Sequence, residues 1–378
     1  MAMSSLPSTV AVLFGGPSPE HDVSILTGLQ AARALVGVPG ITRCRAIYWA
    51  KTGAFYEVDP AGEAKSYLNG PPPGAEALEL ALGPEGGFKV RRGGLRPRVE
   101  TLELGAVLVC CHGGPGEDGS LQSALDLAGV AYAGPSAASA QIGMDKLASA
   151  ALCADAGLPV LARRLLHPGL KDLDFPGPYI VKPRYGGSSI GIEVVADLAT
   201  ALDRLAQSLH FRRGAVIEPY RPDLYDLQVA VRSHPTLALS AIERPIRKSA
   251  GAEILNYADK YVGGEGMAAA PRELPAVLAD ALASELRAAA REAALVLGVR
   301  GVARIDFLSD GETFYLNEIN TIPGSLSRHL FVDPAVSFVQ LLTDLLAEAL
   351  ARPAVHFSSA GADGMVLRDA GSIAAKLA

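Results

Sequence analysis

GVARIDFLSDGETFYLNEINTIPGSLSRHL, residues 301–330, is the stretch of sequence that decides the fold. Positions 302–308 and 313–320 within it are rich in β-branched and aromatic residues, so they predict two strands. The Ser-Asp-Gly sequence at 309–311 predicts the tight turn of a β-hairpin between them. The polar side chains on this hairpin then indicate what the rest of the chain serves.

Four polar side chains on the hairpin predict a cation site. Alternation along a strand places Arg304 and Asp306 on one face of the first strand, and Glu318 and Asn320 on one face of the second. If the hairpin register brings the two faces together, two carboxylates and an amide oxygen converge beside one guanidinium. Oxygen ligands of this kind suit Mg²⁺, which completes its shell with phosphate oxygens and water. The alternative is a solvated sheet face, on which the same side chains meet only water.

Composition limits the class of protein. At 378 residues, the chain is long enough for two or three packed units. Its net charge of −6 and the lack of a dominant basic tract argue against a nucleic-acid partner. We expect no membrane span, because no apolar run is long enough, and no secretory signal. The four cysteines have no metal-ligand spacing, so we expect a reduced, cytoplasmic protein.

The first predicted strand and the turn after it predict one wall of a ligand site. Residues 9–14 form a short apolar run, two glycines follow, and a helical pattern then extends to residue 35. A strand, a glycine turn and a helix open a parallel α/β unit, in which ligands lie at the carboxyl ends of the strands. Glu20 and His21 occupy that position. The alternative for Glu20 is electrostatic stabilisation of the first helical turn.

A second strand leads into a similar turn. The strand is predicted at 106–111, the glycine-rich turn begins at His112, and a helix is predicted at 120–127. Two such turns in one sheet can face a common cleft. His112 is therefore either a substrate-facing residue or a hydrogen-bonded structural histidine.

The middle of the chain carries a predicted nucleotide-binding hairpin. Residues 179–183 predict a strand that carries Lys182, and the sequence GGSSIG follows at 186–191. Glycine lets backbone N–H groups approach an anion closely, and the hydroxyls and Lys182 add further donors. We interpret 186–191 as a flexible hairpin over the phosphates of a nucleotide, with an ordinary hairpin as the alternative. Further on, the glycine-rich segment 249–267 predicts a functional lid or else disorder.

Two helical patterns lie near the end of the chain, and we interpret the first of them as purely structural and the second as amphipathic. They lie at 274–297, opened by a proline and closed by a glycine, and at about 336–351. The tail at 353–378 is rich in small residues and weakly patterned, so we expect it to be loosely attached.

Seven stretches taken together resemble the D-alanine-D-alanine ligase family of the ATP-grasp superfamily. In the order and at the rough spacing of that family, they are VAVLFGG..PEHDVS, HGGPGEDGSLQ, MDK, VKP...GSSIG, NYADKY, ARIDF and LNEINTIPG. The resemblance implies an α/β (α+β) ATP-grasp fold with three domains and with ATP held between the last two. These are an N-terminal parallel-sheet substrate domain at 1–135, a central lid domain at 136–217 and a C-terminal catalytic domain at 218–352.

The resemblance also implies the reaction. ATP phosphorylates the carboxylate of a first D-alanine, and the amine of a second attacks the acylphosphate, so that D-alanyl-D-alanine forms. Phosphorylation gives a poor electrophile a leaving group, and cations must neutralise the charge of the migrating phosphoryl group. The implied partners are ATP, D-alanine and two Mg²⁺ ions, with Mn²⁺ as a substitute, and the implied assembly is a homodimer.

By the same resemblance, each site residue receives a role. The metal ions would be held by Asp306, Glu318 and Asn320. ATP would be bound by Lys146, Lys182, Ser189, Glu218, Asp226 and Lys260. The catalytic residues would be Glu20, Ser188, Tyr261 and Arg304, with Glu20 on the ammonium of the first substrate. The other substrate-binding residues would be His112, Gly324, His329 and Leu330.

Departures from the family pattern bear on the substrate. Asp226 stands where a glutamate usually binds ribose, and it is one methylene shorter. In the lid, Leu255 and Asn256 replace a tyrosine and an aspartate. His329 occupies the position of a serine that touches the carboxylate of the second substrate, whereas the retained Tyr261 favours an amine nucleophile. We therefore expect a ligase for peptidoglycan precursor synthesis or, alternatively, an ATP-grasp amino-acid ligase of specialised metabolism with a different second substrate.

Overall fold

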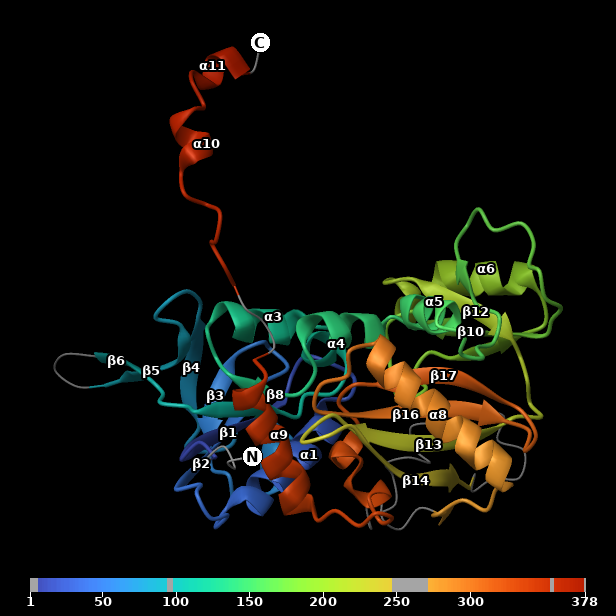
Figure 1. Cartoon of the computed structure of the whole chain (residues 1–378), viewed down its shortest axis with the longest axis horizontal. Coiled ribbons are helices and arrows are strands. Elements are labelled where there is room, and N and C mark those ends of the chain that lie inside the picture. The colour runs from blue at the N-terminus through green and yellow to red at the C-terminus, as the bar shows by residue number, and fades with distance from the viewer. Residues whose placement is uncertain (1–5, 94–97, 247–270, 354–356, 377–378) are drawn as a thin grey trace.

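The computed structural model of the chain describes residues 6–93, 98–246, 271–353 and 357–376. Its strands form three sheets that follow one another along the chain, and helices pack on each of them (Figure 1). A helix with the length and hydropathy of a membrane span is not found in these described ranges. The architecture is the mixed α/β class that the sequence predicts.

The N-terminal sheet has eight strands in the order β6-β5-β4-β3-β2-β1-β7-β8. Its parallel half consists of β1 (Thr9–Gly15), β2 (Arg43–Trp49), β7 (Ala106–Val109) and β8 (Tyr132–Ala133). The antiparallel half consists of β3 (Phe55–Val58), β4 (Glu76–Ala81), β5 (Gly87–Arg92) and β6 (Arg98–Thr101). The predicted parallel sheet is therefore mixed, because β2 to β6 follow one another without the helical crossovers that parallel neighbours need.

Helices from both ends of the chain cover this sheet. Near the N-terminal end they are α1 (His21–Leu35), η1 (Ala64–Tyr67), α2 (Gly114–Glu117) and α3 (Ser120–Leu127). The last long helix, α9 (Phe338–Ala351), returns to pack on β7, β8 and α1 (Figure 1). Strand β1 lies inside the sheet and is buried along nearly its whole length, which explains its continuous apolar run.

The central sheet is antiparallel, with the strand order β11-β10-β12-β9. Its strands are β9 (Arg164–Leu166), β10 (Tyr179–Pro183), β11 (Glu193–Val195) and β12 (Ala215–Pro219). Helices α6 (Leu198–Gln207) and η2 (Leu209–Phe211) pack on this sheet, whereas the preceding α4 (Ala137–Met144) and α5 (Lys146–Asp155) pack on the last strand of the C-terminal sheet. Strands β10 and β11 pair antiparallel across 184–192, which confirms a hairpin around the GGSSIG sequence. Strand β12 spans the domain boundary expected at 217/218, so the central sheet ends slightly later than that boundary.

The C-terminal sheet is antiparallel, with the strand order β15-β14-β13-β16-β17. Its strands are β13 (Tyr225–Arg232), β14 (Ala238–Pro245), β15 (Arg272–Glu273), β16 (Val302–Ser309) and β17 (Phe314–Asn320). Helix α8 (Asp280–Val296) packs on β13 and β14, and η4 (Gly324–Leu330) lies against α1 of the N-terminal unit. The helix predicted at 274–297 begins only at Asp280, because Ala276 N–H bonds to Ile242 O and holds the chain along the sheet edge.

The tail contains two short helices, α10 (Met365–Arg368) and α11 (Ile373–Lys376). Most of its described residues are exposed. In Figure 1 the tail extends away from the three sheets. Its loose attachment stays a prediction.

Candidate active site

The hairpin of β16 and β17 has a register that brings its polar faces together. Arg304 pairs with Asn320, and Asp306 pairs with Glu318. Nε and Nη2 of Arg304 each donate to one carboxylate oxygen of Asp306 at 2.7 Å, and the Asn320 amide donates to Asp306 at 3.1 Å. The predicted convergence of two carboxylates, an amide and a guanidinium is confirmed.

A β-bulge in β17 produces this register. The pair Asp306–Glu318 is followed directly by the pair Phe307–Leu316, so Asn317 is an extra residue on β17. If β17 alternated regularly through Asn317, with no bulge, Glu318 would lie on the face of buried Leu316. The bulge therefore places the second carboxylate beside the first.

Charged side chains of the central unit meet the hairpin at this bulge. Lys182 Nζ on β10 lies 3.0 Å from Glu218 Oε2 on β12, and it donates to Asn317 Oδ1 at 3.0 Å. Arg163 Nε lies 2.8 Å from the other oxygen of Glu218, and Arg163 Nη2 donates to Asn317 O at 3.0 Å. Burial raises the pKa of Glu218, but the charges of Arg163 and Lys182 outweigh it and hold that pKa below its ordinary value. Burial lowers the pKa of Lys182, against the opposing effect of Glu218. Glu218 thus stays ionised and orients both cations.

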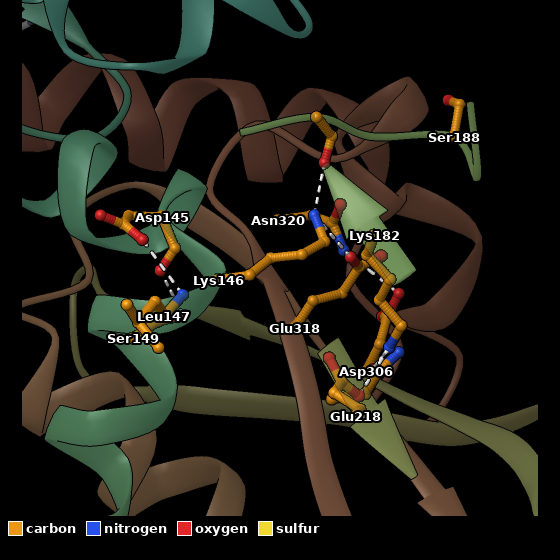
Figure 2. Close-up of polar contacts among 12 residues, drawn as sticks. Asp145, Lys146, Leu147, Ser149, Lys182, Ser188, Glu218, Asp306, Glu318 and Asn320 are labelled. Carbon is orange, nitrogen blue, oxygen red and sulfur yellow. Dashed lines mark hydrogen bonds and ion pairs between the residues drawn. The ribbon is translucent and has the colours of Figure 1, made fainter. Parts of the chain in front are cut away.

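Lys146 brings a further cation from the start of α5. Asp145 caps this helix by accepting hydrogen bonds from Leu147 N at 3.0 Å and Ala148 N at 3.2 Å, which fixes where Lys146 leaves the helix. Lys146 Nζ lies 3.3 Å from Glu318 Oε2. In Figure 2 its side chain reaches from α5 towards the hairpin, close to Lys182 and Glu318.

A cleft with about 960 Å³ of space, partly open to solvent, lies between the central and C-terminal sheets. Its charged lining includes Lys146, Lys182, Glu218, Asp226, Asp306 and Glu318. Its apolar lining includes Leu161, Ile180, Ile192, Leu224 and Leu308. Such walls suit a nucleotide, which has anionic phosphates and a flat base. With Ser189, which also lines the cleft, five of the six predicted ATP-binding residues meet here, while Lys260 lies outside the described residues.

The predicted pair of Glu20 and Ser188 is formed. Ser188 Oγ donates to Glu20 Oε1 across the gap between the N-terminal and central units. A Cβ atom on Gly187 would lie 2.7 Å from Glu20 Oε2, and one on Gly113 would lie 2.5 Å from it, so the seat of this carboxylate requires glycine on both sides. The third expected member, Tyr261, lies outside the described residues, as do both lid departures.

His112 is buried, and both of its ring nitrogens have partners. Nδ1 lies 2.6 Å from Ile322 O, and Nε2 lies 2.8 Å from Thr27 Oγ1. Burial lowers the pKa of His112, although Glu20 and the bond to Ile322 act to raise it, so the ring is neutral. The sequence left two roles open for His112, and this geometry favours the structural one.

The segment that follows β17 has an unusual backbone. Ser325, Leu326 and Ser327 have φ values of 48°, 50° and 50°, although none of them is glycine. Each left-handed residue of this kind costs roughly 1–2 kcal/mol, so neighbouring contacts must hold the segment in place. One such contact is the hydrogen bond from Ser325 N to Thr27 Oγ1 at 3.0 Å.

Leu330 and His329, at the end of η4, were both expected to bind substrate, but their side chains lie in different surroundings. Leu330 has 0% exposure and packs in the N-terminal core, so its side chain is a core residue and not a pocket wall. His329 Nε2 lies 3.3 Å from Glu243 Oε2, and Arg272 Nη1 lies 2.8 Å from the other oxygen of Glu243. Burial raises the pKa of Glu243, but the bond to His329 and the charges of His329, Arg272 and Arg304 outweigh it and hold that pKa below its ordinary value.

Comparison with known proteins bears on this site directly. The family model described as "D-ala D-ala ligase N-terminus" matches residues 9–135, and the one described as "D-ala D-ala ligase C-terminus" matches residues 170–347. A D-alanine--D-alanine ligase of Corynebacterium aurimucosum is 32% identical over 368 residues, which cover 92% of this chain and 98% of the relative. The chain belongs to the D-alanine-D-alanine ligase family.

Further relatives agree with this family. A D-alanine--D-alanine ligase of a Methylobacterium species is 33% identical over 374 residues, which cover 91% of this chain and 92% of the relative. The crystal structure of the Helicobacter pylori D-alanine-D-alanine ligase matches with a TM-score of 0.68 at 25% identity, over 92% of this chain and 99% of that one. The VanG D-Ala:D-Ser ligase of Enterococcus faecalis shares the fold, with a TM-score of 0.70 at 22% identity, over 91% of this chain and 99% of that one. The protein is thus an ATP-grasp ligase of the D-alanine-D-alanine ligase family.

The oxygen ligands that the β16–β17 hairpin offers fit Mg²⁺. Asp306, Glu318 and Asn320 offer two carboxylates and an amide oxygen. Among the described residues there is no group of three or more His, Cys, Asp and Glu that could hold a metal ion. Mg²⁺ does not need one, because one or two carboxylates commonly bind it together with substrate phosphates and water.

Five residues of the site were not predicted from the sequence. They are Thr27, Glu117, Arg163, Glu243 and Asn317. For Asn317 a signal existed, because the apolar positions around it break strict alternation and indicate a bulge. The other four act on partners that are far away in sequence, and no local pattern marks them.

Proposed function

We propose that this chain joins two D-alanine molecules into D-alanyl-D-alanine, with conversion of ATP to ADP and phosphate, to supply a peptidoglycan precursor. The observation that carries this proposal is one cleft in which Lys146 and Lys182 lie with Asp306 and Glu318. The Glu20 carboxylate lies across the glycine-rich turn that borders the cleft. The names of the relatives support the same reaction.

Charged side chains of the cleft would hold the phosphates of ATP, and its apolar walls would hold the base. Lys146 and Lys182 offer ammonium groups to the phosphates, while the apolar walls receive the base. Asp306, Glu318 and Asn320 would hold Mg²⁺, which supplies charge neutralisation for the phosphates when it is bound.

In the first step, a carboxylate oxygen of the first D-alanine attacks the γ-phosphorus of ATP. The new O–P bond forms as the bond from the γ-phosphorus to the bridging oxygen breaks, and ADP leaves with that electron pair. Glu20 holds the substrate ammonium, and the bond from Ser188 keeps Glu20 in one orientation. Lys146 and Lys182 stabilise the negative charge that moves onto ADP.

In the second step, the amine of the second D-alanine, once it has lost a proton, attacks the carbonyl carbon of the acylphosphate. A C–N bond forms, the C–O bond to phosphate breaks with its electron pair on the phosphate, and the nitrogen gives up a proton to the departing inorganic phosphate. Arg304, which Asp306 holds through two hydrogen bonds, and the Gly324 amide stabilise the oxyanion that forms on the way.

The test is phosphate release from ATP and Mg²⁺ with single D- and L-amino acids and with pairs of them, followed by mass spectrometry of the product. D-Alanine alone should drive release and give D-alanyl-D-alanine. D-Alanine that is inert in every combination would contradict the proposal. The control is Glu318→Ala, which should lose turnover yet keep the wild-type thermal transition, and wild-type-like release by this variant would contradict the metal assignment.

A second candidate function is the ligation of D-alanine to a different second substrate. His329 favours it, because a histidine held by buried Glu243 stands where the family pattern has a serine at the second pocket. A histidine paired with a carboxylate in this way changes the size and the hydrogen bonding of the pocket. The solved D-Ala:D-Ser ligase with the same fold shows that such ligases use this architecture.

We expect His329→Ser to change the KM of the second substrate about tenfold, while the KM of ATP changes by less than about twofold, because one such hydrogen bond is worth on the order of 1.4 kcal/mol. The measurement is steady-state phosphate release with each substrate varied in turn. Equal effects on both KM values would count against the placement of His329 in the second pocket.

A further inference from the structure

Two side chains of the N-terminal unit bridge the two ends of the short segment that carries Gly324. Ser325 N–H donates to Thr27 Oγ1 at 3.0 Å, Thr27 Oγ1 lies 2.8 Å from His112 Nε2, and His112 Nδ1 lies 2.6 Å from Ile322 O. Since a carbonyl oxygen only accepts, Nδ1 carries the ring proton, and Nε2 of the neutral ring accepts from the Thr27 hydroxyl. The three bonds therefore run in one direction, from Ser325 N–H to Ile322 C=O, and each donor has an acceptor.

Glu117 holds the same segment through its carboxyl group. Its Oε1 accepts from Ile322 N–H at 3.0 Å, and its Oε2 accepts from Gly113 N–H at 3.0 Å. Thr27, His112 and Glu117 are 1%, 3% and 6% exposed. Because these bonds are shielded from water, they orient their partners strongly.

The Gly324 amide lies between Ile322 and Ser325, the two residues that these hydrogen bonds hold. Pro323 has no N–H, whereas the N–H groups of Ile322, Ser325 and Leu326 each have an acceptor. The N–H of buried Gly324 has no acceptor within the part of the chain that the structure describes. A buried amide without a partner is costly and rare, so a ligand atom is the natural acceptor.

We infer that Thr27, His112 and Glu117 are positioning residues that aim the Gly324 amide at the acyl oxygen of the first substrate. The inference rests on the proposed function, which places the oxyanion of the second step at this amide. His112 then acts through the segment from Ile322 to Ser325 and does not touch substrate. The left-handed backbone of Ser325 fits this role, because it persists only where surrounding contacts hold it.

The experiment compares the wild type with Thr27→Val, which keeps the shape of the side chain but removes its donor and its acceptor. We expect kcat to fall about tenfold or more, because displaced oxyanion donors cost this much, with the KM of ATP within about twofold of wild type. Thr27→Ser should restore kcat. Hydrogen exchange of the ligand-free proteins, followed by mass spectrometry, should show faster exchange at 322–326 in Thr27→Val than in wild type.

Ser24→Ala is the matched control. Ser24 lies on the same helix, is 0% exposed, donates to Cys110 O at 2.8 Å and accepts from Gly15 N at 2.7 Å, and none of these groups belongs to the segment. We expect it to lower the thermal stability while leaving kcat and the exchange at 322–326 unchanged.

Two outcomes would overturn the inference. One is a loss of kcat in Ser24→Ala as large as that in Thr27→Val, which would make the effect merely structural. The other is wild-type exchange at 322–326 in Thr27→Val. The exchange measurement needs no substrate, so failure of the proposed function, seen as inert D-alanine with wild type, is distinguishable from failure of the positioning role.

Discussion

Glu117 is a carboxyl group whose protonation state is coupled to folding. Burial raises the pKa of Glu117 from 4.5 to about 7, with the charge of Glu20 acting in the same direction, while the bonds from Gly113 and Ile322 oppose the shift. In the unfolded chain the ordinary value of 4.5 applies, so between these two values the folded state binds more protons than the unfolded state. The contribution of Glu117 to the free energy of unfolding is therefore largest below about pH 4.5 and is lost as the pH rises through about 7.

We expect Glu117→Gln to remove this dependence on pH. Between about pH 4.5 and about pH 7, the free energy of unfolding of wild type should fall by on the order of 3 kcal/mol relative to the variant, at about 1.4 kcal/mol per pKa unit. Urea unfolding at several pH values from about 4 to about 8 measures this difference, and groups common to both proteins cancel. Parallel pH profiles for the two proteins would show that Glu117 has an ordinary pKa.

At the scale of elements, local sequence accounts for the β16–β17 hairpin but not for η4. The turn residues and strand composition that predict the hairpin lie within 302–320, so the sequence carries them locally. The left-handed backbone of Ser325, Leu326 and Ser327 could not be predicted, because these residue types do not favour positive φ. Thr27, which is far away in sequence, supplies one contact that holds this backbone.

Deletion of Asn317 tests the account of strand alternation at the bulge. Without the extra residue, Glu318 follows Leu316 directly, and regular alternation keeps Glu318 and Asn320 on the face of Asp306. We therefore expect the deletion variant to release phosphate at a rate within about threefold of that of Asn317→Ala. Asn317→Ala is the control, since it keeps the extra residue and loses only the acceptor for Lys182. Much lower activity of the deletion variant than of Asn317→Ala would contradict this account of the strand alternation.

At the scale of the whole molecule, contacts between distant parts of the chain determine how the units pack together, and the sequence did not predict these contacts. The resemblance to a family predicted the order of the units and a cleft between the last two, whereas periodicity alone predicted single elements. Neither showed that α9 would return to the N-terminal sheet, where Leu341, Leu342, Leu345 and Leu346 join its core. Arg300 also links distant parts, because it donates to Tyr132 O, Gly134 O and Arg352 O.

These contacts predict where the chain can be shortened. A protein that ends at Pro353 keeps α9 and the Arg352 carbonyl, and it loses only a tail whose described residues are mostly exposed. We expect its melting temperature to stay within about 2 °C of wild type and its kcat to be unchanged. A protein that ends at Gln340 loses four leucines that are each at most 3% exposed. At roughly 1.5–3 kcal/mol for each buried side chain, their loss equals most of a typical folding free energy of about 5–15 kcal/mol. This shorter protein should therefore be unfolded by circular dichroism. Loss of activity in the first variant would instead show that the tail takes part in the function.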